Sequence, residues 1–454
     1  MKSLLSEAMA FQRVFRFASI PLLAAALAFA GAPQAHTQSL LRDADIEYGL
    51  RQVANPVLTA AGLSPARVKI LVVNDSSLNA FVVSNDAIFV HYGLINRLDN
   101  AAMLQAVIAH EAAHIVNGHL ARRMGNLGAA RTAASLGFAL AVIAAAAGEG
   151  KAASGLALGT QYSALGSFFR HTRAEEASAD QSGVRYLAHA GIDPAAMSQV
   201  LDIFRGQEIL SVDRQPPYLR SHPLSRDRMR AVEGYVTAYK LSAPADQRVN
   251  YWFSRARGKL SAYTRSPKWT LGRLKDTPYQ DVRLLREAIA EHRQSRTKTA
   301  LAAIDGAIAL RPSDPFLHDQ RGQILLETRN FAAARAAYQQ AAELAPNDAM
   351  ILSGYGRSLL ATDDVENAVR VLEKARLIDF RDGIMLRDLS VAYAKTGQTG
   401  MASVVTAERY ALQGRMEDAG VHAKRASGLL AQGTGPWQRA QDVLIAAERA
   451  EKRR

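Results

Sequence analysis

The residues most suited to chemistry are two histidines and a glutamate in the run His110-Glu111-Ala112-Ala113-His114. Residues four positions apart lie on one face of an α-helix, so both imidazoles can bind a single metal ion. Glu111 lies beside that face and can accept a proton from an attacking water. The flanking residues are mostly apolar, which predicts a buried helix. The pattern therefore predicts a zinc site that activates water for hydrolysis.

A catalytic zinc site needs a third protein ligand and keeps its fourth position open for water. The chain contains no cysteine, so the third ligand must be a carboxylate or another histidine. The segment 173–180 supplies carboxylates, and Glu176 and Asp180 share a helical face. One of these two can bind the metal while the other orients a histidine. Glu175 competes as the ligand on chemical grounds, and the residues alone leave the choice open.

The elements that must position these groups predict an α+β fold that is mostly helical. Three short runs rich in β-branched residues predict a small sheet, with strands at 68–73, 78–83 and 87–92. Helical patterns predict helices at 40–63 and 100–123, and a polar helix at 172–190 that stops before Gly191. The metal-binding residues would then lie on two of these helices.

The C-terminal half repeats with a period of 34 residues. Leu310-Arg-Pro312 recurs as Leu344-Ala-Pro346, and alanines keep the same spacing at Ala300, Ala334, Ala368 and Ala402. This period is typical of the tetratricopeptide repeat (TPR), a helix–turn–helix unit whose stacking forms a solenoid. We expect three to four units over 279–431, followed by a terminal helix.

The first 35 residues resemble a secretory signal peptide. Basic residues precede an apolar run at 17–31, and small residues follow it. This pattern predicts export to the periplasm of a Gram-negative cell, with an uncleaved N-terminal anchor as the alternative. The expected domains are a signal peptide at 1–35, a zinc metalloprotease domain at 36–265, a linker at 266–278 and a TPR domain at 279–454.

A resemblance to a known family rests on three matched segments. These are His110-Glu111-x-x-His114, Glu176-x-x-x-Asp180, and Ser221-His222-Pro223-Leu224 with Arg228. They resemble the HtpX and CAAX-prenyl-protease type of zinc metallopeptidase. The resemblance implies a zincin-like domain that holds one Zn²⁺ per chain with His110, His114 and Glu176. It implies Glu111 as general base and acid, with Asp180 as a catalytic-site residue that supports a ligand.

The same resemblance suggests roles for two residues near the end of the protease domain. His222 would occupy the fourth metal position and exclude the catalytic water, although an ordinary loop histidine is the alternative. Arg228 would hold a ligand carboxylate or polarise the scissile carbonyl. The other histidines near the motifs, His91, His119 and His171, lack ligand spacing, and His119 is expected to cap or pack.

Substrate is expected to bind along the hairpin. A peptide can add as a strand to an exposed sheet edge, where backbone groups make the hydrogen bonds. The segment Asn79, Ala80 and Phe81 resembles the edge strand of the family, whereas a plain core strand is the alternative interpretation.

With a signal peptide and a TPR array, the chain resembles those family members that act in outer-membrane protein assembly. This implies unfolded or misassembled outer-membrane proteins as substrates, and a chaperone-like role in their assembly and quality control beside proteolysis. It also implies the outer-membrane assembly machinery as a partner of the TPR domain. The alternative is a TPR chaperone or adaptor in which proteolysis is secondary or gated off. The apolar block 132–147 is interpreted as a lid or a buried hairpin; as a membrane-spanning helix it would indicate an intramembrane protease.

The formal charge of +13 is concentrated in one region. Residues 214–298 hold 19 lysines and arginines against 7 acidic residues. This excess predicts a surface for acidic partners or peripheral contact with lipid headgroups, or a merely solvated face. The chain has no aromatic-and-basic motif of a nucleic-acid-binding protein, so nucleic acid is not expected as a partner.

Overall fold

The computed structural model describes residues 40–122, 172–211, 214–239, 244 and 246–452. The predicted signal peptide and the block 132–147 lie outside the described residues. Within the described part of the chain, none of the helices has the length and hydropathy needed to cross a membrane.

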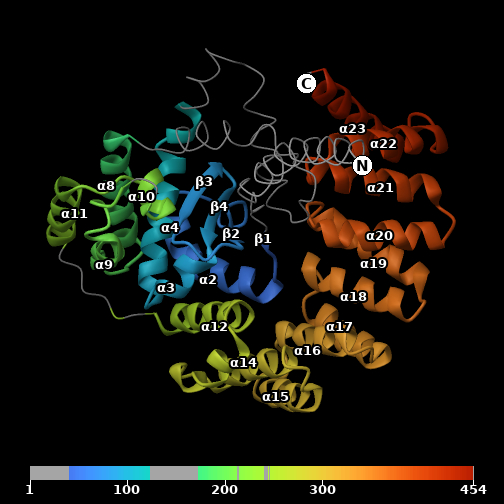
Figure 1. The fold of residues 1–454 in the computed structure, drawn as a ribbon, viewed down its shortest axis with the longest axis horizontal. Helices are drawn as coiled ribbons and strands as arrows, with labels where there is room; N and C mark the ends of the chain where they lie inside the picture. The colour runs from blue at the N-terminus through green and yellow to red at the C-terminus, as the bar shows by residue number, and fades with distance from the viewer. Residues whose placement is uncertain (1–39, 123–171, 212–213, 240–243, 245, 453–454) are drawn as a thin grey trace, which may run out of the picture.

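A four-stranded sheet forms one layer of the N-terminal half (Figure 1). Its strands are β1 (Leu40–Leu41), β2 (Lys69–Val73), β3 (Ala80–Ser84) and β4 (Ala87–His91). The order is β1-β2-β4-β3, with β2 and β4 parallel and the outer pairs antiparallel. The three predicted strands are confirmed, and β3 lies at one edge.

The prediction that the first helix begins at residue 40 was wrong. Leu40 pairs with Val73, and α2 (Ala44–Ala60) begins only after Asp43. The Asp43 side chain accepts a hydrogen bond from the backbone of Ile46, which caps the helix at this point.

The remaining helices of this half cover the sheet and one another. They are α3 (Tyr92–Arg97), α4 (Ala101–Val116), α8 (Arg173–His189), α9 (Ala195–Phe204), α10 (Pro217–Ser221) and α11 (Arg226–Tyr239). The helix expected at 100–123 was predicted too long, because Asn117 caps α4 and Gly118 adopts φ +67°. That left-handed conformation is a common helix terminator and suits glycine.

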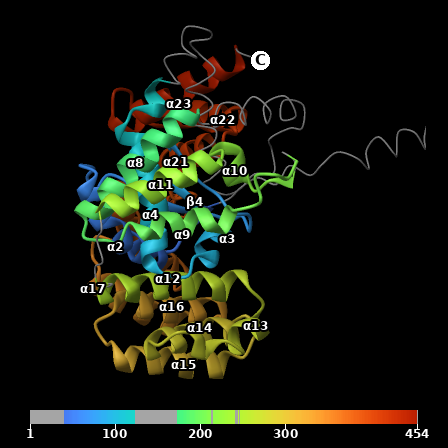
Figure 2. The same ribbon diagram turned by 90° about the vertical axis from the view of Figure 1, so that its left-hand side faces the viewer.

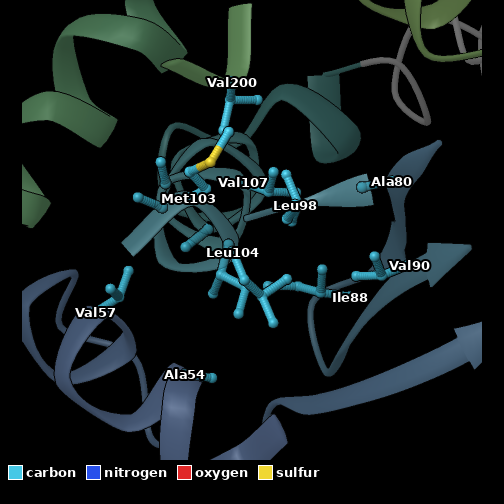
Figure 3. Packing of buried hydrophobic residues seen from close by; sticks show 14 of the residues in the cluster. Ala54, Val57, Ala80, Ile88, Val90, Leu98, Met103, Leu104, Val107 and Val200 are labelled. Carbon is cyan, nitrogen blue, oxygen red and sulfur yellow. The ribbon is translucent and has the colours of Figure 1, made fainter. Parts of the chain in front are cut away.

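Helix α4 lies at the centre of the apolar core. Its side chains pack against α2 on one side, the sheet on another and α9 on a third, as the labelled residues Ala54, Val57, Ile88, Val90, Leu104, Val107 and Val200 illustrate (Figure 3). Helices α8, α9 and α11 form a further layer beside α4 (Figure 2). The helix that carries the two histidines is therefore buried on all sides, as its apolar flanks predict.

The C-terminal half is a solenoid of helix pairs. Its members are α14 (Gln280–His292), α15 (Thr297–Leu310), α16 (Pro315–Glu327), α17 (Phe331–Leu344), α18 (Ala349–Ala361), α19 (Val365–Ile378), α20 (Gly383–Lys395), α21 (Thr399–Leu412), α22 (Met416–Leu429) and α23 (Gly435–Glu451). The first eight helices form four pairs, and α22 with the terminal helix makes one pair more than the three to four units predicted. The terminal helix α23 packs on α22 as a fifth pair.

The solenoid curves around the sheet-containing half (Figure 1). Helix α12 (Gln247–Thr264) lies between the two halves and packs on both α2 and α14. The segment expected as a linker contains α13 (Pro267–Leu271) and the 3₁₀ turn η2 (Leu274–Asp276). Further along, Asp379 lies 2.9 Å from Arg42 Nη2 and 3.4 Å from Lys69 Nζ. The solenoid therefore contacts the sheet-containing half at two separate places.

Close helix packing in the solenoid depends on glycine, and this allows a stability prediction. A Cβ at Gly322 in α16 would lie 2.7 Å from the ring of the buried Tyr338 in α17. We expect Gly322→Ala to lower the free energy of unfolding by about 1–3 kcal/mol through overpacking, although alanine is the better helix former. Chemical denaturation measures this change.

The matched control is Gly428→Ala in α22, where a Cβ would meet no atom within 4 Å. That variant should be as stable as the wild type or slightly more stable. Equal stability of Gly322→Ala and Gly428→Ala would contradict the packing argument.

Candidate metal centre

Three neighbouring elements bring the predicted metal-site residues together. Helix α4 carries His110, Glu111 and His114, and helix α8 packs against it with Glu176 facing the histidines. His222 follows directly after α10 and completes the group. The side chains of these residues are at most 1% exposed. A buried cluster of this kind has to be compensated by a bound ion or by mutual hydrogen bonds.

Four ligand atoms converge at this point. The Nε2 atoms of His110 and His114 are 3.1 Å apart, and the Nδ1 atom of His222 lies 3.2 Å from His110 Nε2. Glu176 Oε1 lies 2.9 Å from His222 Nδ1 and 3.5 Å from His114 Nε2. All four atoms lie within 4.8 Å of one another.

These separations fit a small divalent cation. A tetrahedral site with metal–ligand bonds of about 2.0–2.1 Å has ligand atoms about 3.3 Å apart. Four of the six separations, 2.9–3.5 Å, bracket that value, and the other two are at most 4.8 Å. Three imidazoles and one carboxylate are also the donor set that a protein without cysteine can offer to zinc. The residues present therefore fit a metal of this kind.

Glu176 and Glu175, which the sequence left as competing ligands, have different surroundings. The Glu175 side chain accepts a hydrogen bond from the Thr172 backbone at 2.9 Å, and the Thr172 side chain accepts one from the backbone of Glu175. This reciprocal pair is a capping box at the start of α8. Glu175 therefore caps the helix, while Glu176 faces the histidines.

Arg228 on α11 pairs with both carboxylates of α8. It forms a two-pronged contact with Asp180, with Nη2 at 2.9 Å from Oδ1, and its Nη1 lies 2.6 Å from Glu176 Oε2. Burial alone would raise the pKa of Glu176, but Arg228 and the neighbouring histidines hold it well below its usual range. The same arginine lowers the pKa of Asp180 despite burial. Both carboxylates are therefore ionised.

Asp180 also orients one of the histidines. Its Oδ1 atom lies 3.0 Å from His110 Nδ1, on the side of the ring away from the cluster. Burial opposes protonation of His110, yet Glu176 and Asp180 raise its pKa to about 9. An environment that favours a proton this strongly also favours a divalent cation, which the two carboxylates attract in the same way.

Glu111 is a fully buried carboxylate that lacks the usual compensation. Its exposure is 0%, and neither of its oxygens has a hydrogen-bond partner among the described residues. The Nε2 atom of His222 lies 3.5 Å from Glu111 Oε1. Burial raises the pKa of Glu111, which makes it a stronger proton acceptor. An orphaned carboxylate of this kind is destabilising and therefore indicates a functional group.

The predicted edge strand lies beside the cluster. The backbone carbonyl of Asn79 accepts a hydrogen bond from His91 on β4, so it faces into the sheet. The carbonyls of Leu78 and Ala80 face the other way, because alternate residues of a strand point in opposite directions. His222 Nε2 lies 3.3 Å from the Ala80 carbonyl oxygen. Phe81 points to the far side and stacks on Phe89.

The sequence did not predict that Tyr218 contacts His222 and the backbone before β3. Its ring packs against His222 with centroids 4.6 Å apart, and against Phe204 at 4.7 Å. Its backbone N–H donates to the Leu78 carbonyl at 3.2 Å. The nearby Pro216-Pro217 pair, which begins α10, was the available signal that this loop has a defined shape.

The other histidines lie outside the group of ligand atoms. The His119 ring packs against His114, with their Nδ1 atoms 2.8 Å apart, as its spacing predicts. His91 lies at the end of β4 beside Ser77 and Asp75, and burial lowers its pKa to about 4. His171 is not among the described residues.

Comparison with known families finds a match to the sheet-containing half of the chain. The model of peptidase family M48 matches residues 42–236, a segment that contains every residue of the cluster. The chain carries an M48 peptidase domain. A tetratricopeptide-repeat model matches residues 315–348, which span α16 and α17. The fold is therefore an M48 domain with a small sheet, joined to a helical TPR array.

Relatives of known name share this arrangement at low identity. The Beta-barrel assembly-enhancing protease of Escherichia coli K12 is 23% identical over 356 residues, 76% of this chain and 72% of that protein. The protein of the same name in Yersinia pestis is 28% identical over 41% of this chain. The mitochondrial metalloendopeptidase OMA1 of Schizosaccharomyces pombe is 26% identical over 41% of this chain. The matches span only 37% of the Yersinia protein and 51% of the yeast protein.

Solved structures with TPR folds are similar to part of the chain. YrrB, described as a TPR protein with an unusual peptide-binding site, is 16% identical with a TM-score of 0.31, over 38% of this chain and 91% of that chain. MamA from Desulfovibrio magneticus RS-1 is 18% identical with a TM-score of 0.31, over 35% of this chain and 93% of that chain. At these scores, the repeat architecture rests on the helix pairs and the family model.

Proposed function

We propose that the chain is a zinc-dependent endopeptidase of the periplasm that hydrolyses peptide bonds in outer-membrane proteins. The observation that carries this proposal is the convergence of four ligand atoms beside a buried carboxylate without a hydrogen-bond partner. The M48 family model, which names a peptidase family, supports the reaction type. His110, His114 and Glu176 are proposed as the ligands of one Zn²⁺ per chain.

The mechanism follows from the positions of these groups. When bound, zinc supplies Lewis acidity, which lowers the pKa of a water molecule and polarises the scissile carbonyl. Glu111 accepts the proton of the attacking water and delivers it to the leaving amine. Asp180 holds the His110 ring in orientation through Nδ1, and Arg228 fixes the carboxylates of both Asp180 and Glu176.

Segment 217–222 is proposed to hold the site closed. The His222 ring lies between Glu176, Glu111 and the Ala80 carbonyl, where the catalytic water and substrate would have to bind. The Tyr218 backbone N–H also donates a hydrogen bond to the carbonyl of Leu78. These two carbonyls are the acceptors that a substrate strand added to β3 would use. Substrate binding along Asn79, Ala80 and Phe81 therefore requires this segment to move.

The closed geometry around His222 also favours a second candidate function. With the fourth ligand position taken by His222, proteolysis would be gated off, and the TPR array would act as a chaperone or adaptor. The two candidates differ in what the chain does to a bound client: the first cleaves it, whereas the second only holds it.

Location and partners are proposed from the relatives. Two are named for β-barrel assembly, a process of the bacterial outer membrane, which supports unfolded or misassembled outer-membrane proteins as substrates. TPR arrays bind other proteins, so the assembly machinery is the proposed partner of the repeats. The basic run at the N-terminus, followed by an apolar stretch, supports export to the periplasm, and the basic excess at 214–298 supports peripheral membrane contact.

His222→Ala tests both the reaction and the closed state. We expect the zinc-loaded variant to cleave unfolded casein at least about tenfold faster than the wild type, because the fourth ligand position becomes available to water. The measurements are zinc per chain and the cleavage rate, with and without a chelator. Arg220→Ala, an exposed residue two positions earlier, is the matched control and should leave the rate unchanged.

The possible outcomes separate the ideas. If His222→Ala cleaves no faster than the wild type while zinc remains bound, His222 does not close the site. If neither protein cleaves casein at any zinc concentration, the endopeptidase proposal fails and the chaperone is favoured.

A further inference from the structure

A second concave site lies at the junction of the M48 domain and the first repeats. It is an open groove of about 490 Å³ at the start of α12. Four of its lining residues belong to α12, and the other two lie just before α14 and just after α15: Gln247, Arg248, Tyr251, Trp252, Tyr279 and Arg311. The groove uses none of the residues of the metal centre.

The floor of the groove is a rigid aromatic surface. Tyr251 is only 8% exposed, and its hydroxyl donates to Asp281 Oδ2 at 2.6 Å. The rings of Trp252 and Tyr279 stand nearly edge-on to Tyr251, each with a centroid distance of 5.1 Å. Three rings held in this way offer apolar surface at little entropic cost on binding.

Two guanidinium groups provide the polar part of the groove. The Arg311 guanidinium lies 4.4 Å from the centre of the Tyr251 ring, and its Nε pairs with Asp281. Arg248 donates to the neutral Gln52 side chain at 3.1 Å, and within the described part of the chain no carboxylate forms an ion pair with it. None of the six lining residues is acidic. The groove is therefore lined by cations without an equal number of anions.

The nearby carboxylates are already engaged. Asp281 accepts from Tyr251 and pairs with Arg311 beneath the floor. Asp246 caps α12 by accepting hydrogen bonds from the backbones of Arg248 and Val249. The surrounding sequence, 214–298, carries a net excess of 12 positive charges, and only three of its cations, Arg228, Arg255 and Lys259, form ion pairs with carboxylates outside this segment among the described residues. The field in the groove therefore attracts anions.

These observations decide which ligand chemistry fits. A site lined by aromatic rings alone would suit a cationic ligand. Here the Arg311 guanidinium already lies over the face of Tyr251 and would repel a second cation. Arginine pairs best with carboxylates, through two parallel hydrogen bonds, and the neighbouring rings can cover apolar atoms. We propose that this groove binds an acidic segment of a partner polypeptide, with its carboxylates on Arg248 and Arg311 and its apolar atoms on Trp252 and Tyr279.

This inference goes beyond the proposed function, because it needs no metal and no cleavage. A partner bound here would contact α12 and the ends of α14 and α15 at once, since all of them contribute to the groove. It would therefore bind across the junction between the peptidase and the repeats.

The test is the binding of a fluorescently labelled hexaglutamate peptide to the full chain, measured by anisotropy. We expect saturable binding that weakens as salt is raised and is at least about tenfold tighter than that of a hexaserine peptide. Arg248→Glu should weaken binding at least about tenfold, and Arg248→Lys should retain part of it. Thermal unfolding of each variant verifies that the fold is intact.

Arg230→Glu in α11 is the matched control, because this arginine is exposed and lies outside the groove. It should bind hexaglutamate like the wild type. Equal binding of hexaglutamate and hexaserine would overturn the proposal, as would equal weakening by Arg248→Glu and Arg230→Glu. Binding to phosphatidylglycerol vesicles with no binding of hexaglutamate would also overturn it and would assign the groove to a lipid surface.

Discussion

Glu111→Gln is expected to abolish peptide hydrolysis while leaving the fold and the metal site intact. The carboxylate is fully buried next to the four ligand atoms and has no hydrogen-bond partner among the described residues, so an isosteric amide fits the same space. The amide cannot accept a proton, and the loss of a general base costs about 10²–10⁴-fold in rate. Cleavage of casein by the zinc-loaded protein measures the effect.

The comparison is sharpest in the His222→Ala background, where the proposed closed state is relieved. In that background Glu111→Gln should lower the cleavage rate by the full factor of about 10²–10⁴, with zinc per chain and the melting temperature unchanged. Gln105→Glu in α4 is not a suitable control, because Gln105 is buried and donates to the Val53 carbonyl. Glu175→Gln, which alters only the capping carboxylate of α8, serves better and should keep most of the activity. Retained hydrolysis in Glu111→Gln would assign the proton transfer to another group.

Arg255→Met is expected to be the most destabilising substitution outside the metal centre. Arg255 on α12 is 1% exposed, and its Nε lies 2.7 Å from Asp45 on α2. Its Nη1 forms an ion pair with Asp314, which caps α16, and donates a hydrogen bond to Tyr251 on α12 itself. Burial would lower the pKa of Arg255, but the two aspartates raise it well above its usual value, so the side chain stays charged.

Removal of one partner from a buried ion pair leaves the other charge without compensation, which costs about 3–5 kcal/mol. We expect Arg255→Met to lower the free energy of unfolding by about that amount, measured by urea denaturation with two spectroscopic probes. Arg255→Lys keeps the positive charge but loses the paired donors of the guanidinium group. Its free energy of unfolding should lie between those of Arg255→Met and the wild type. Arg257→Met, on the same helix and in no ion pair within the described residues, should cost much less. Similar urea denaturation midpoints for Arg255→Met and Arg257→Met would show that the contact between the two domains does not depend on the ion pairs of Arg255.

The buried network also explains how the two domains are held together. Lys259, one turn after Arg255 on α12, is completely buried, and its Nζ lies 2.9 Å from Asp43. Asp43 and Asp45 raise its pKa above its usual value despite the opposing effect of burial. Cations from a single helix thus join the start of α2 to the start of α16. We attribute the arrangement of the peptidase and the repeats to this helix.

Several features could be predicted because they depend on neighbours along the chain. The spacing of His110 and His114 places both on one helical face whatever surrounds the helix. The 34-residue period predicts helix pairs because each unit packs only on its neighbours. Thr172 and Glu175, three residues apart, were a readable capping-box signal that would have favoured Glu176 as the residue that faces the histidines.

Other features required contacts between residues far apart in the sequence. Leu40–Leu41 becomes a strand only because β2 offers a pairing edge, and two residues are too short for a periodic signal. Tyr218 and His222 cover the carbonyls of Leu78 and Ala80, which lie about 140 residues earlier in the chain. No local pattern predicts such a pairing.

The sequence by itself therefore determined that His110 and His114 share one helical face and that the C-terminal half is a repeat array, since both arise within single helices or between adjacent ones. Only the tertiary structure decided which backbone carbonyls Tyr218 and His222 cover and how the two domains are joined. His222 reaches the cluster because α10 packs on the open edge of β3, and the domains meet because the charged side chains of α12 are buried between them. The physical reason is the same in both cases: buried polar groups must find partners, and the fold alone determines which partners lie within reach.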